Sequence, residues 1–404
     1  MAASPETDVT VVILNRDGRS HLAASVPAAL AMDGVRGPRS VLVADNGSTD
    51  GSVGFVERAF AGVRTLSFAD NPGFAGGNNR AVDAVRTPYA LLLNNDTAPR
   101  PDVLARLRHE AAASGAAFVG ARLVTWDERR LDFDGGGAAF TGHGHPLGHG
   151  RAVTGAPGVP RDTLFCSGAA VLARTDAFRA LGGFDETYCM YYEDVDLGWR
   201  AWLAGYGARH VPAAVVRHRG GGSAHLLTRA DVGRRHEHNA LATLVKNLGR
   251  QTLARVLPAA LALAAVRAGA DRGVIAAAVP PPGAWPPVPG PHWLGWVWLE
   301  PLELDWRRLW EARARVQLAR RRPDGDVLPL LGRPLAPVPP GGAGWLALRE
   351  AHRRFRLQEL FGPLPRPSLR AAAAAVLEAR PRPGRRPARG GPAGLAGRAD
   401  RRAP

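Results

Sequence analysis

Carboxylates cluster in one stretch of the chain that is otherwise rich in aromatic and apolar residues, Gly182–Arg200. Glu193, Asp194 and Asp196 follow a run of three tyrosines within this stretch. Like charges this close repel one another, and neighbouring rings exclude water, so a cation, a metal or a raised pKa must compensate. A carboxylate in such a setting can accept a proton from a substrate hydroxyl, and we expect Asp194 to be a general base.

The same residues have a simpler interpretation as the start of a helix. Acidic side chains are favoured in the first helical turn because they interact with the positive end of the helix dipole. A helix from Glu193 to Ala204 would turn Val195, Trp199 and Trp202 toward a core. Both interpretations place the candidate base at the mouth of the helix.

The elements that must position this stretch alternate between strand and helix. We expect strands at Asp8–Asn15, Ser40–Ala44, Val63–Phe68, Tyr89–Leu93, Phe118–Val124, Phe165–Leu172 and Gly207–Val216, and helices at Ser20–Ala31, Val53–Phe60, Asn78–Arg86 and Asp176–Leu181. This alternation predicts an α/β sandwich of parallel strands and crossover helices, whose ligands bind at the carboxyl ends of the strands.

Polar loops follow four of the expected strands. They are Asn15–Asp17, Asp45–Ser52, Asn71–Asn79 and Asn94–Asp96. Because the strands end at one edge of the sheet, these loops bring Asp45, Asn78, Asn79 and Asp96 into a site of nucleotide size. Each loop taken alone is also an ordinary turn with capping residues, and the glycines after Pro72 match a phosphate loop only loosely.

Two residues at strand ends are candidate metal ligands. Mg²⁺ and Mn²⁺ take one or two protein carboxylates together with phosphate oxygens of a substrate, and Asp96 suits that need. His218 ends a later strand and precedes Gly-Gly-Gly-Ser, a sequence that lets backbone donors approach a phosphate. We expect His218 to complete the metal shell with Asp96, although a lone histidine is more often structural. The segment Gly135–Gly150 lacks ligands at zinc spacing and is expected to be a mobile flap without a metal.

Taken in order, these segments resemble the family 2 inverting glycosyltransferases of GT-A fold, in particular the bacterial rhamnosyltransferase- and galactofuranosyltransferase-like enzymes. The resemblance rests on Val11–Asn15, Asp45–Ser52, Asn71–Asn79, Asn94–Asp96, Gly182–Glu186, Glu193–Asp196 and His218. It implies a Rossmann-like nucleotide-binding sandwich with a mixed, mostly parallel sheet, followed by a C-terminal helical extension.

The resemblance also implies residue roles. The implied nucleotide-binding residues are Asn15, Asp45, Asn46, Ser48, Asn78, Asn79 and Asn95; the metal ligands are Asp96 and His218; the catalytic base is Asp194; and the residues of the acceptor site or supporting the base are Glu193, Asp196 and Trp199. One position departs from the family pattern, because Asn94 replaces the first acid of the metal-binding triplet. Metal binding would then depend on Asp96 and His218.

The function implied is inverting transfer of a sugar from dTDP-rhamnose or a UDP-sugar, with Mg²⁺ or Mn²⁺, to a hydroxyl of a glycan or polyprenyl-linked acceptor in cell-surface polysaccharide synthesis. Two other classes stay open. Asn94 raises the alternative of a nucleotide-sugar-binding protein without catalysis. The net charge of +16 raises that of a nucleic-acid-binding protein, but the arginines lie without a recognisable binding module, so no nucleic acid partner is expected.

The length of 404 residues allows more than one domain. We expect a GT-A domain at 1–250, a helical Trp- and Arg-rich extension at 251–330, and a Pro/Arg/Gly-rich region at 331–404 that is disordered from about Arg380. Two cysteines and the lack of a signal or membrane-spanning pattern favour a cytoplasmic protein. Tryptophans between Trp293 and Trp310, ahead of Arg313–Arg322, predict either peripheral contact with the inner face of the plasma membrane or an ordinary packed helical pair.

Overall fold

A computed structural model describes residues 8–188, 190–220, 229–271, 305–331 and 343–361. The region predicted to be disordered from Arg380 lies outside these residues, as do Cys189 and the tryptophans Trp293, Trp296 and Trp298. The predicted domain boundaries stay predictions.

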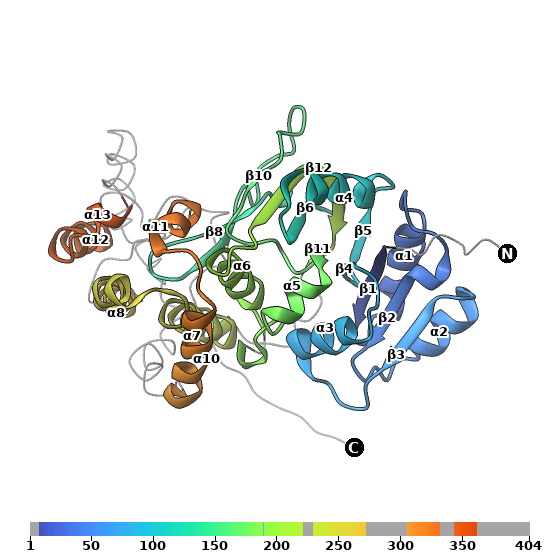
Figure 1. Cartoon of the computed structure of the whole chain (residues 1–404), viewed down its shortest axis with the longest axis horizontal. Helices are drawn as coiled ribbons and strands as arrows, with labels where there is room; N and C mark the ends of the chain where they lie inside the picture. The colour runs from blue at the N-terminus through green and yellow to red at the C-terminus, as the bar shows by residue number, and fades with distance from the viewer. Residues whose placement is uncertain (1–7, 189, 221–228, 272–304, 332–342, 362–404) are drawn as a thin grey trace, which may run out of the picture.

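A mixed sheet runs through the centre of the molecule (Figure 1). Its strands are β1 (Val9–Asn15), β2 (Val41–Asp45), β3 (Arg64–Ser67), β4 (Tyr89–Asn94), β5 (Thr97–Pro99), β6 (Phe118–Thr125), β7 (Leu131–Phe133), β10 (Arg161–Asp162), β11 (Ala170–Arg174) and β12 (Ala208–His218). The strand order is β10-β12-β6-β11-β4-β1-β2-β3, with β5 paired to β12 and β7 paired to β6. A separate hairpin is formed by β8 (Gly136–Ala138) and β9 (Gly144–Pro146).

Helices cover the sheet and extend beyond its β6/β12 side (Figure 1). They are α1 (Arg19–Leu30), α2 (Ser52–Ala59), α3 (Gly73–Asp83), α4 (Val103–Ser114), α5 (Thr175–Ala180), α6 (Glu193–Leu203), α7 (Arg229–Asn247), α8 (Arg250–Asp271), α10 (Trp306–Ala319), α11 (Asp324–Val327), α12 (Ala343–Arg354) and α13 (Gln358–Phe361). All seven residues of β1 are buried, as expected for a β-branched run covered on both faces. The predicted α/β sandwich with a mixed, mostly parallel sheet and C-terminal helices is confirmed.

The helix predicted to start at Asn78 begins earlier, at Gly73. Gly73 has φ 75°, a backbone conformation that glycine adopts without strain. A Cβ atom at Gly77 would lie 2.4 Å from Oδ1 of Asn46, so this position must be glycine for α3 to pack on the sheet. The glycines that loosely resembled a phosphate loop are therefore explained by close helix packing.

The segment predicted to be a mobile flap is a packed hairpin, so that prediction is wrong. Phe140 is 1% exposed, and a Cβ atom at Gly144 would lie 2.5 Å from the Val195 side chain of α6. On the other side, a Cβ atom at Gly142 would meet the backbone of Ala240 in α7. The hairpin is thus held between two helices.

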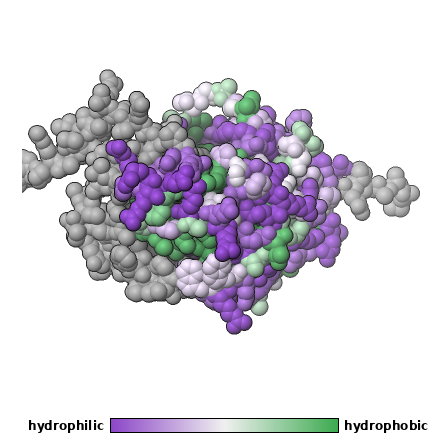
Figure 2. Space-filling model, turned by 60° about the vertical axis from the view of Figure 1, so that its left-hand side comes forward, coloured by the Kyte–Doolittle hydropathy of each residue, from purple (hydrophilic) through white to green (hydrophobic). Residues whose placement is uncertain are grey.

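The C-terminal helices dock on the sheet domain through α10. Arg313 is buried and donates hydrogen bonds to the carbonyl oxygens of Val245 and Leu248 at the end of α7. The amides of Arg321 and Arg322 donate to the Leu203 carbonyl at the end of α6. In the view of Figure 2, hydrophilic side chains cover most of the described surface, and the broadest hydrophobic area lies beside the residues drawn in grey. Within the described ranges, no helix has the length and apolar character needed to cross a bilayer.

Candidate active site

The strands that carry the candidate residues end at the same edge of the sheet. β1, β2 and β4 are parallel, β11 is antiparallel to both β4 and β6, and β12 is parallel to β6. Strand direction reverses from β4 to β11 and again from β11 to β6, so β6 and β12 run in the same direction as β1. Asn15, Asp45, Asn94 and His218, the last residues of their strands, therefore lie along one edge.

Asp45 is the centre of a hydrogen-bonded group at this edge. It is 2% exposed and accepts bonds from Nδ2 of Asn15 at 2.8 Å and from the Ser48 amide at 2.9 Å and hydroxyl at 2.6 Å. Asn95 donates to Oδ1 of Asn15 at 2.8 Å. The side chain of Asn15 is fully buried, so it orients Asp45 and Asn95 and does not itself face an open cleft.

The other three predicted nucleotide contacts also bond within the protein. Asn46 donates to the Gly73 carbonyl at 2.8 Å, and Asn78 donates to the Phe74 carbonyl one turn earlier in its helix. Asn79 donates a hydrogen bond to the Phe184 carbonyl and accepts one from the Phe184 amide, each at 2.9 Å. In this structure these amides join α3 to β2 and to the segment before α6, and contact with a sugar diphosphate stays a prediction.

The two candidate metal ligands lie together. Nε2 of His218 is 3.4 Å from Oδ1 of Asp96, and Nδ1 of His218 is 2.6 Å from Oδ2 of Asp132. Burial alone would lower the pKa of His218, but the two carboxylates outweigh it and raise this pKa to about 10. Without a bound cation the residue thus carries a positive charge between two negative ones, and its Nε2 must release a proton before it can bind a metal.

The residues present fit a divalent cation that is shared with a substrate. Asp132 at Nδ1 fixes the ring so that Nε2 faces Asp96, the arrangement in which a carboxylate orients a metal-binding histidine. No cluster of three or more His, Cys, Asp or Glu suited to a metal occurs among the described residues. Asp96 and His218 would therefore supply two ligands, and phosphate oxygens and water the others, as Mg²⁺ commonly requires.

Asp194 lies at the start of α6, joined to the same edge through the loop before β11. Its Oδ2 accepts a bond from the Gly168 amide at 3.2 Å and its Oδ1 from the Val195 amide at 2.8 Å. The carbonyl oxygen of Ala169, the residue after Gly168, accepts a hydrogen bond from the Asn94 amide at 3.1 Å. The predicted helix beginning at Glu193 is confirmed, and the role of Asp194 as a base stays a prediction.

Burial makes Asp194 a stronger base than an ordinary aspartate. Removal of water raises the pKa of both Asp194 and Glu193, and the charge of Asp194 raises that of Glu193 further. Oε2 of Glu193 is buried and accepts no hydrogen bond from the described part of the chain. The pair therefore holds its first proton on Glu193, and Asp194 is the carboxylate that ionises first.

The raised pKa of Asp194 should appear in the pH dependence of the reaction. A base works only when deprotonated, so kcat/KM should fall as pH decreases through this pKa, above the ordinary aspartate value of roughly 3.9. Rates measured from roughly pH 4 to pH 9 would locate this acid limb. Glu193→Gln imitates the protonated neighbour and should leave the limb in place. A limb within the ordinary aspartate range would contradict a buried base.

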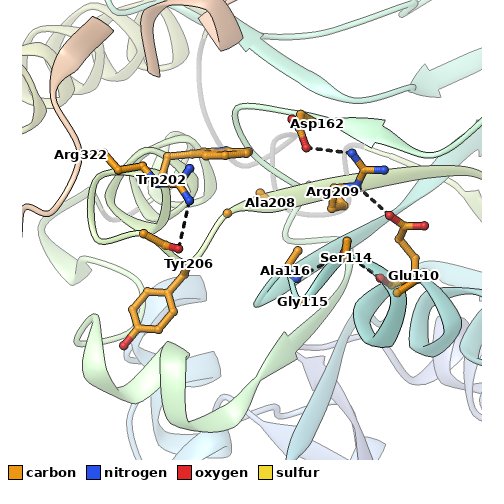
Figure 3. Close-up of a pocket in the computed structure, with 13 residues that line it drawn as sticks. Glu110, Ser114, Gly115, Ala116, Asp162, Trp202, Tyr206, Ala208, Arg209 and Arg322 are labelled. Carbon is orange, nitrogen blue, oxygen red and sulfur yellow. Dashed lines mark hydrogen bonds and ion pairs between the residues drawn. The ribbon is translucent and has the colours of Figure 1, made fainter. Parts of the chain in front are cut away.

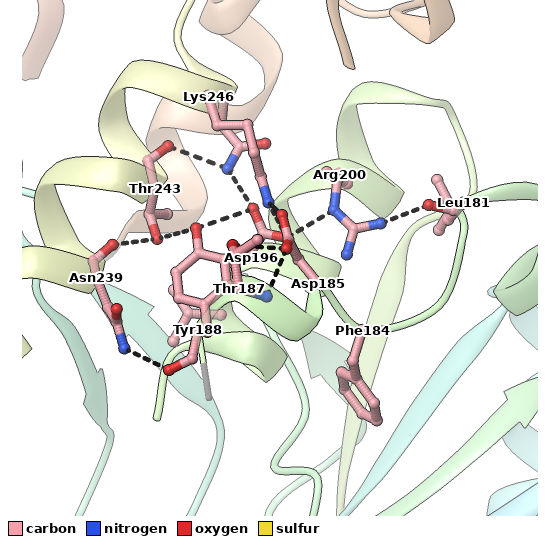
Figure 4. Close-up of polar contacts among 12 residues, drawn as sticks. Leu181, Phe184, Asp185, Thr187, Tyr188, Asp196, Arg200, Asn239, Thr243 and Lys246 are labelled. Carbon is pink, nitrogen blue, oxygen red and sulfur yellow. Dashed lines mark hydrogen bonds and ion pairs between the residues drawn. The ribbon is translucent and has the colours of Figure 1, made fainter. Parts of the chain in front are cut away.

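Asp196 and Trp199 are 0% and 1% exposed, so neither lines an open acceptor site, and the alternative that they support the base stays a prediction. The side chain of Asp196 points into a buried cluster. Nε of Arg200 lies 2.7 Å from its Oδ2, and Nζ of Lys246 lies 2.8 Å from the same atom (Figure 4). Lys246 also lies 2.5 Å from Oδ2 of Asp185. This cluster joins α6 to α7, and Trp199 fills the core beneath it.

A hollow of about 490 Å³ lies away from this edge (Figure 3). It is lined by Ala208 and Arg209 at the start of β12, whereas His218 ends that strand roughly 23 Å further on, since β12 is irregular between Val211 and Val215 and runs alongside Phe118–Thr125 of β6. Arg209 is already paired with Glu110 at 2.7 Å and with Asp162 at 2.9 Å. The hollow is therefore separate from the candidate site.

Sequence reasoning missed Asp132, Lys246 and the helix α4. Asp132 sits in a three-residue edge strand, and nothing in its local sequence links it to His218, 86 positions later. Lys246 stands in a helical sequence that gives no sign of the carboxylates it meets. The apolar spacing of Val103, Leu104 and Leu107, all buried, is a signal that would have found α4.

A model of the family described as "Glycosyltransferase like family 2" matches residues 5–253. The chain belongs to this family. Among curated relatives, the pre-mycofactocin glycosyltransferase of Mycobacterium tuberculosis is 33% identical over 217 residues, which span 52% of this chain and 42% of the relative. The N-acetylglucosaminyl-diphospho-decaprenol L-rhamnosyltransferase of the same organism is 31% identical over 209 residues, 45% of this chain and 66% of the relative.

The match thus spans less than two thirds of the length of these relatives. Among solved structures, residues 1–349 of S. aureus TarS in complex with UDP align with a TM-score of 0.46 at 12% identity, covering 92% of both chains. The resemblance to family 2 inferred from the sequence is confirmed.

Proposed function

We propose that this chain is an inverting glycosyltransferase that moves a sugar from a nucleoside diphosphate sugar to a hydroxyl of a glycan or lipid-linked acceptor. The observation that carries the proposal is the shared sheet edge, which holds the Asp45 group, the Asp96–His218 pair and the half-buried Asp194. This sheet edge therefore carries residues of suitable chemistry for the nucleotide, the leaving group and the acceptor.

In the proposed reaction, Asp194 takes the proton of the acceptor hydroxyl, and the hydroxyl oxygen attacks the anomeric carbon. The bond from that carbon to the diphosphate breaks, and its electron pair leaves with the diphosphate. Attack opposite to the departing group inverts the anomeric centre. Asp96 and His218 would hold a divalent cation, which would neutralise negative charge on the leaving group.

For the donor we propose dTDP-rhamnose or a UDP-sugar, and for the acceptor a polyprenyl-linked glycan used in cell-surface polysaccharide synthesis. Support comes from the names of the relatives, one of which is a rhamnosyltransferase acting on N-acetylglucosaminyl-diphospho-decaprenol. The reaction would take place in the cytoplasm, at the inner face of the membrane that holds such an acceptor.

Thermal stabilisation by nucleotides tests the proposed site. UDP or dTDP with Mn²⁺ should raise the melting temperature of the purified chain, and the same nucleotide with a chelator should raise it less. Asp96→Asn should remove most of the metal-dependent part. A folded protein that no pyrimidine diphosphate stabilises, with or without metal, would overturn the proposed donor site.

The outer face of α10 favours contact with a membrane. Trp310 is 51% and Leu318 87% exposed, and the exposed residues around them include Arg307, Arg308 and Arg315. Exposed tryptophan beside arginine suits the interface of an anionic bilayer. Arg307 pairs with Glu311 and Arg308 with Asp305, so Arg315 adds the net positive charge among these three arginines, and a cationic residue there contributes about 1 kcal/mol. We propose that this face, the α10 face, makes peripheral contact with the bilayer that carries the acceptor.

Vesicle sedimentation tests the α10 face. The chain should bind phosphatidylglycerol vesicles more than phosphatidylcholine vesicles, and less at high salt. Replacing Trp310 and Leu318 with serine removes at least about 1.5 kcal/mol of apolar burial, so binding should fall by tenfold or more. Val159→Ser, at a residue 79% exposed elsewhere, is the matched control. Equal binding by the double variant would contradict the proposed contact.

A further inference from the structure

The backbone that leads into α6 is strained. Tyr191 has φ 68° and Tyr192 has φ 74°, so two bulky residues in succession adopt the left-handed conformation. Side chains with a Cβ atom disfavour this conformation by roughly 1–2 kcal/mol each. Such strain persists only where surrounding contacts hold it, and it occurs preferentially at functional sites.

Two side chains of α7 contact this backbone or its side chains. The ring of His236 packs against the rings of Tyr191 and Tyr192, with centroids 4.9 Å and 5.4 Å apart, and Asn239 bonds the backbone itself. Asn239 is 2% exposed, and its Nδ2 reaches the carbonyl oxygens of Tyr188 at 3.3 Å, Met190 at 3.1 Å and Tyr191 at 2.9 Å (Figure 4 shows the bond to Tyr188). The Tyr191 carbonyl belongs to a left-handed residue, and the Tyr188 carbonyl also accepts a bond from the Met190 amide, so Asn239 ties the turn on both sides of Met190 to α7. Asn239 therefore both satisfies and fixes this backbone.

The fixed backbone sets the direction of the candidate base. The Asp196 amide donates to the Tyr192 carbonyl at 2.8 Å, so the first turn of α6 starts directly on the strained residue. Asp194 lies within that turn, and its contact with Gly168 at 3.2 Å depends on the angle at which the chain enters the helix. Relaxation of Tyr191 and Tyr192 to negative φ would turn Asp194 away from the sheet edge.

We propose that Asn239 is a positioning residue, which holds the strained entry to α6 so that Asp194 points at the acceptor hydroxyl. This inference rests on the proposed function for its catalytic consequence. The strain and its anchor are properties of the chain itself, and they can be tested without turnover.

Asn239→Ala tests the catalytic consequence. Misplacing a catalytic group by about 1 Å can cost up to 100-fold, so kcat should fall about 10- to 100-fold while the KM for the nucleotide sugar stays unchanged. Asn247→Ala is the matched control, because Asn247 is a buried asparagine of the same helix that bonds Asp196 and Thr243 and does not contact the strained backbone. The control should lower stability and leave the kcat of the folded enzyme unchanged.

Tyr191→Gly tests the role of strain, because glycine adopts positive φ without penalty. Added to Asn239→Ala, it should restore part of the lost kcat. Equal kcat losses in the Asn239 and Asn247 variants, or a loss confined to KM, would overturn the proposal.

Hydrogen exchange separates this inference from the proposed function. In Asn239→Ala, the amides of residues 191–194 should exchange faster than in Asn247→Ala, whether or not the protein transfers a sugar. Unchanged exchange at these amides would reject the anchoring role of Asn239. If amide exchange rises in Asn239→Ala but the wild-type chain transfers no sugar, the proposed function is contradicted and the anchoring role of Asn239 is supported.

Discussion

Asp194→Asn is expected to abolish sugar transfer while leaving nucleotide binding intact. Loss of a general base lowers rates by about 10²–10⁴-fold, since the acceptor hydroxyl then keeps its proton during attack. The asparagine has nearly the same shape, and its oxygen can still accept the bond from Gly168. Turnover measured beside the binding of UDP or dTDP separates the chemical step from the binding step.

Asp176→Asn is the matched control for this experiment. Asp176 occupies the first turn of α5, is exposed and pairs with Arg174 at 2.7 Å, so the same chemical change falls at another helix start. The control should keep the wild-type rate. If Asp194→Asn kept more than about a tenth of that rate, Asp194 would not be the base.

Lys246→Met is expected to cause the largest loss of stability among single substitutions outside the site. Lys246 is 2% exposed and lies between the carboxylates of Asp185 and Asp196 (Figure 4). Burial alone would raise the pKa of Asp185, but the charge of Lys246 outweighs it and lowers this pKa to about 2. Methionine would leave the carboxylate of Asp185 without its cation and that of Asp196 with the cation of Arg200 alone, a loss of about 3–5 kcal/mol.

Thermal or urea unfolding measures this loss, which corresponds to a melting temperature lower by roughly 6–20 °C. Arg80→Met is the control, because the Arg80–Asp70 pair at 2.6 Å is exposed and such pairs contribute about 0–1 kcal/mol. Similar stabilities of the two variants would show that the buried cluster does not hold α7 to α6.

Local patterns in the sequence were sufficient to predict the strands of the sheet and the polar loops that follow them. The β-branched run of β1 and the polar loops after β1, β2 and β4 depend on neighbouring residues, so they are visible in the sequence. Parallel topology then brings the loops to one edge, which is why Asp45, Asp96 and His218 were gathered correctly. The position of α6 followed from its acidic first turn.

Side-chain directions within that frame could not be predicted from the sequence. Asp196 and Trp199 follow Asp194 closely in the sequence, yet the helix directs their side chains into the core. Their burial depends on Lys246 and Arg200, and only the tertiary structure places Lys246 beside Asp196. The same holds for Asp132, whose pairing with His218 is set by the register of β7 on β6.

The most direct test of the proposed function is the anomeric configuration of the product. The chain would be incubated with Mn²⁺, a hydroxyl-bearing acceptor and the nucleotide sugar that stabilises it most, and the new glycoside examined by proton NMR. We expect release of the nucleoside diphosphate and a glycosidic bond of opposite anomeric configuration to the donor. A product that retains the donor configuration would contradict the single-base mechanism, and a folded protein that binds the nucleotide sugar but never transfers it would contradict the enzyme.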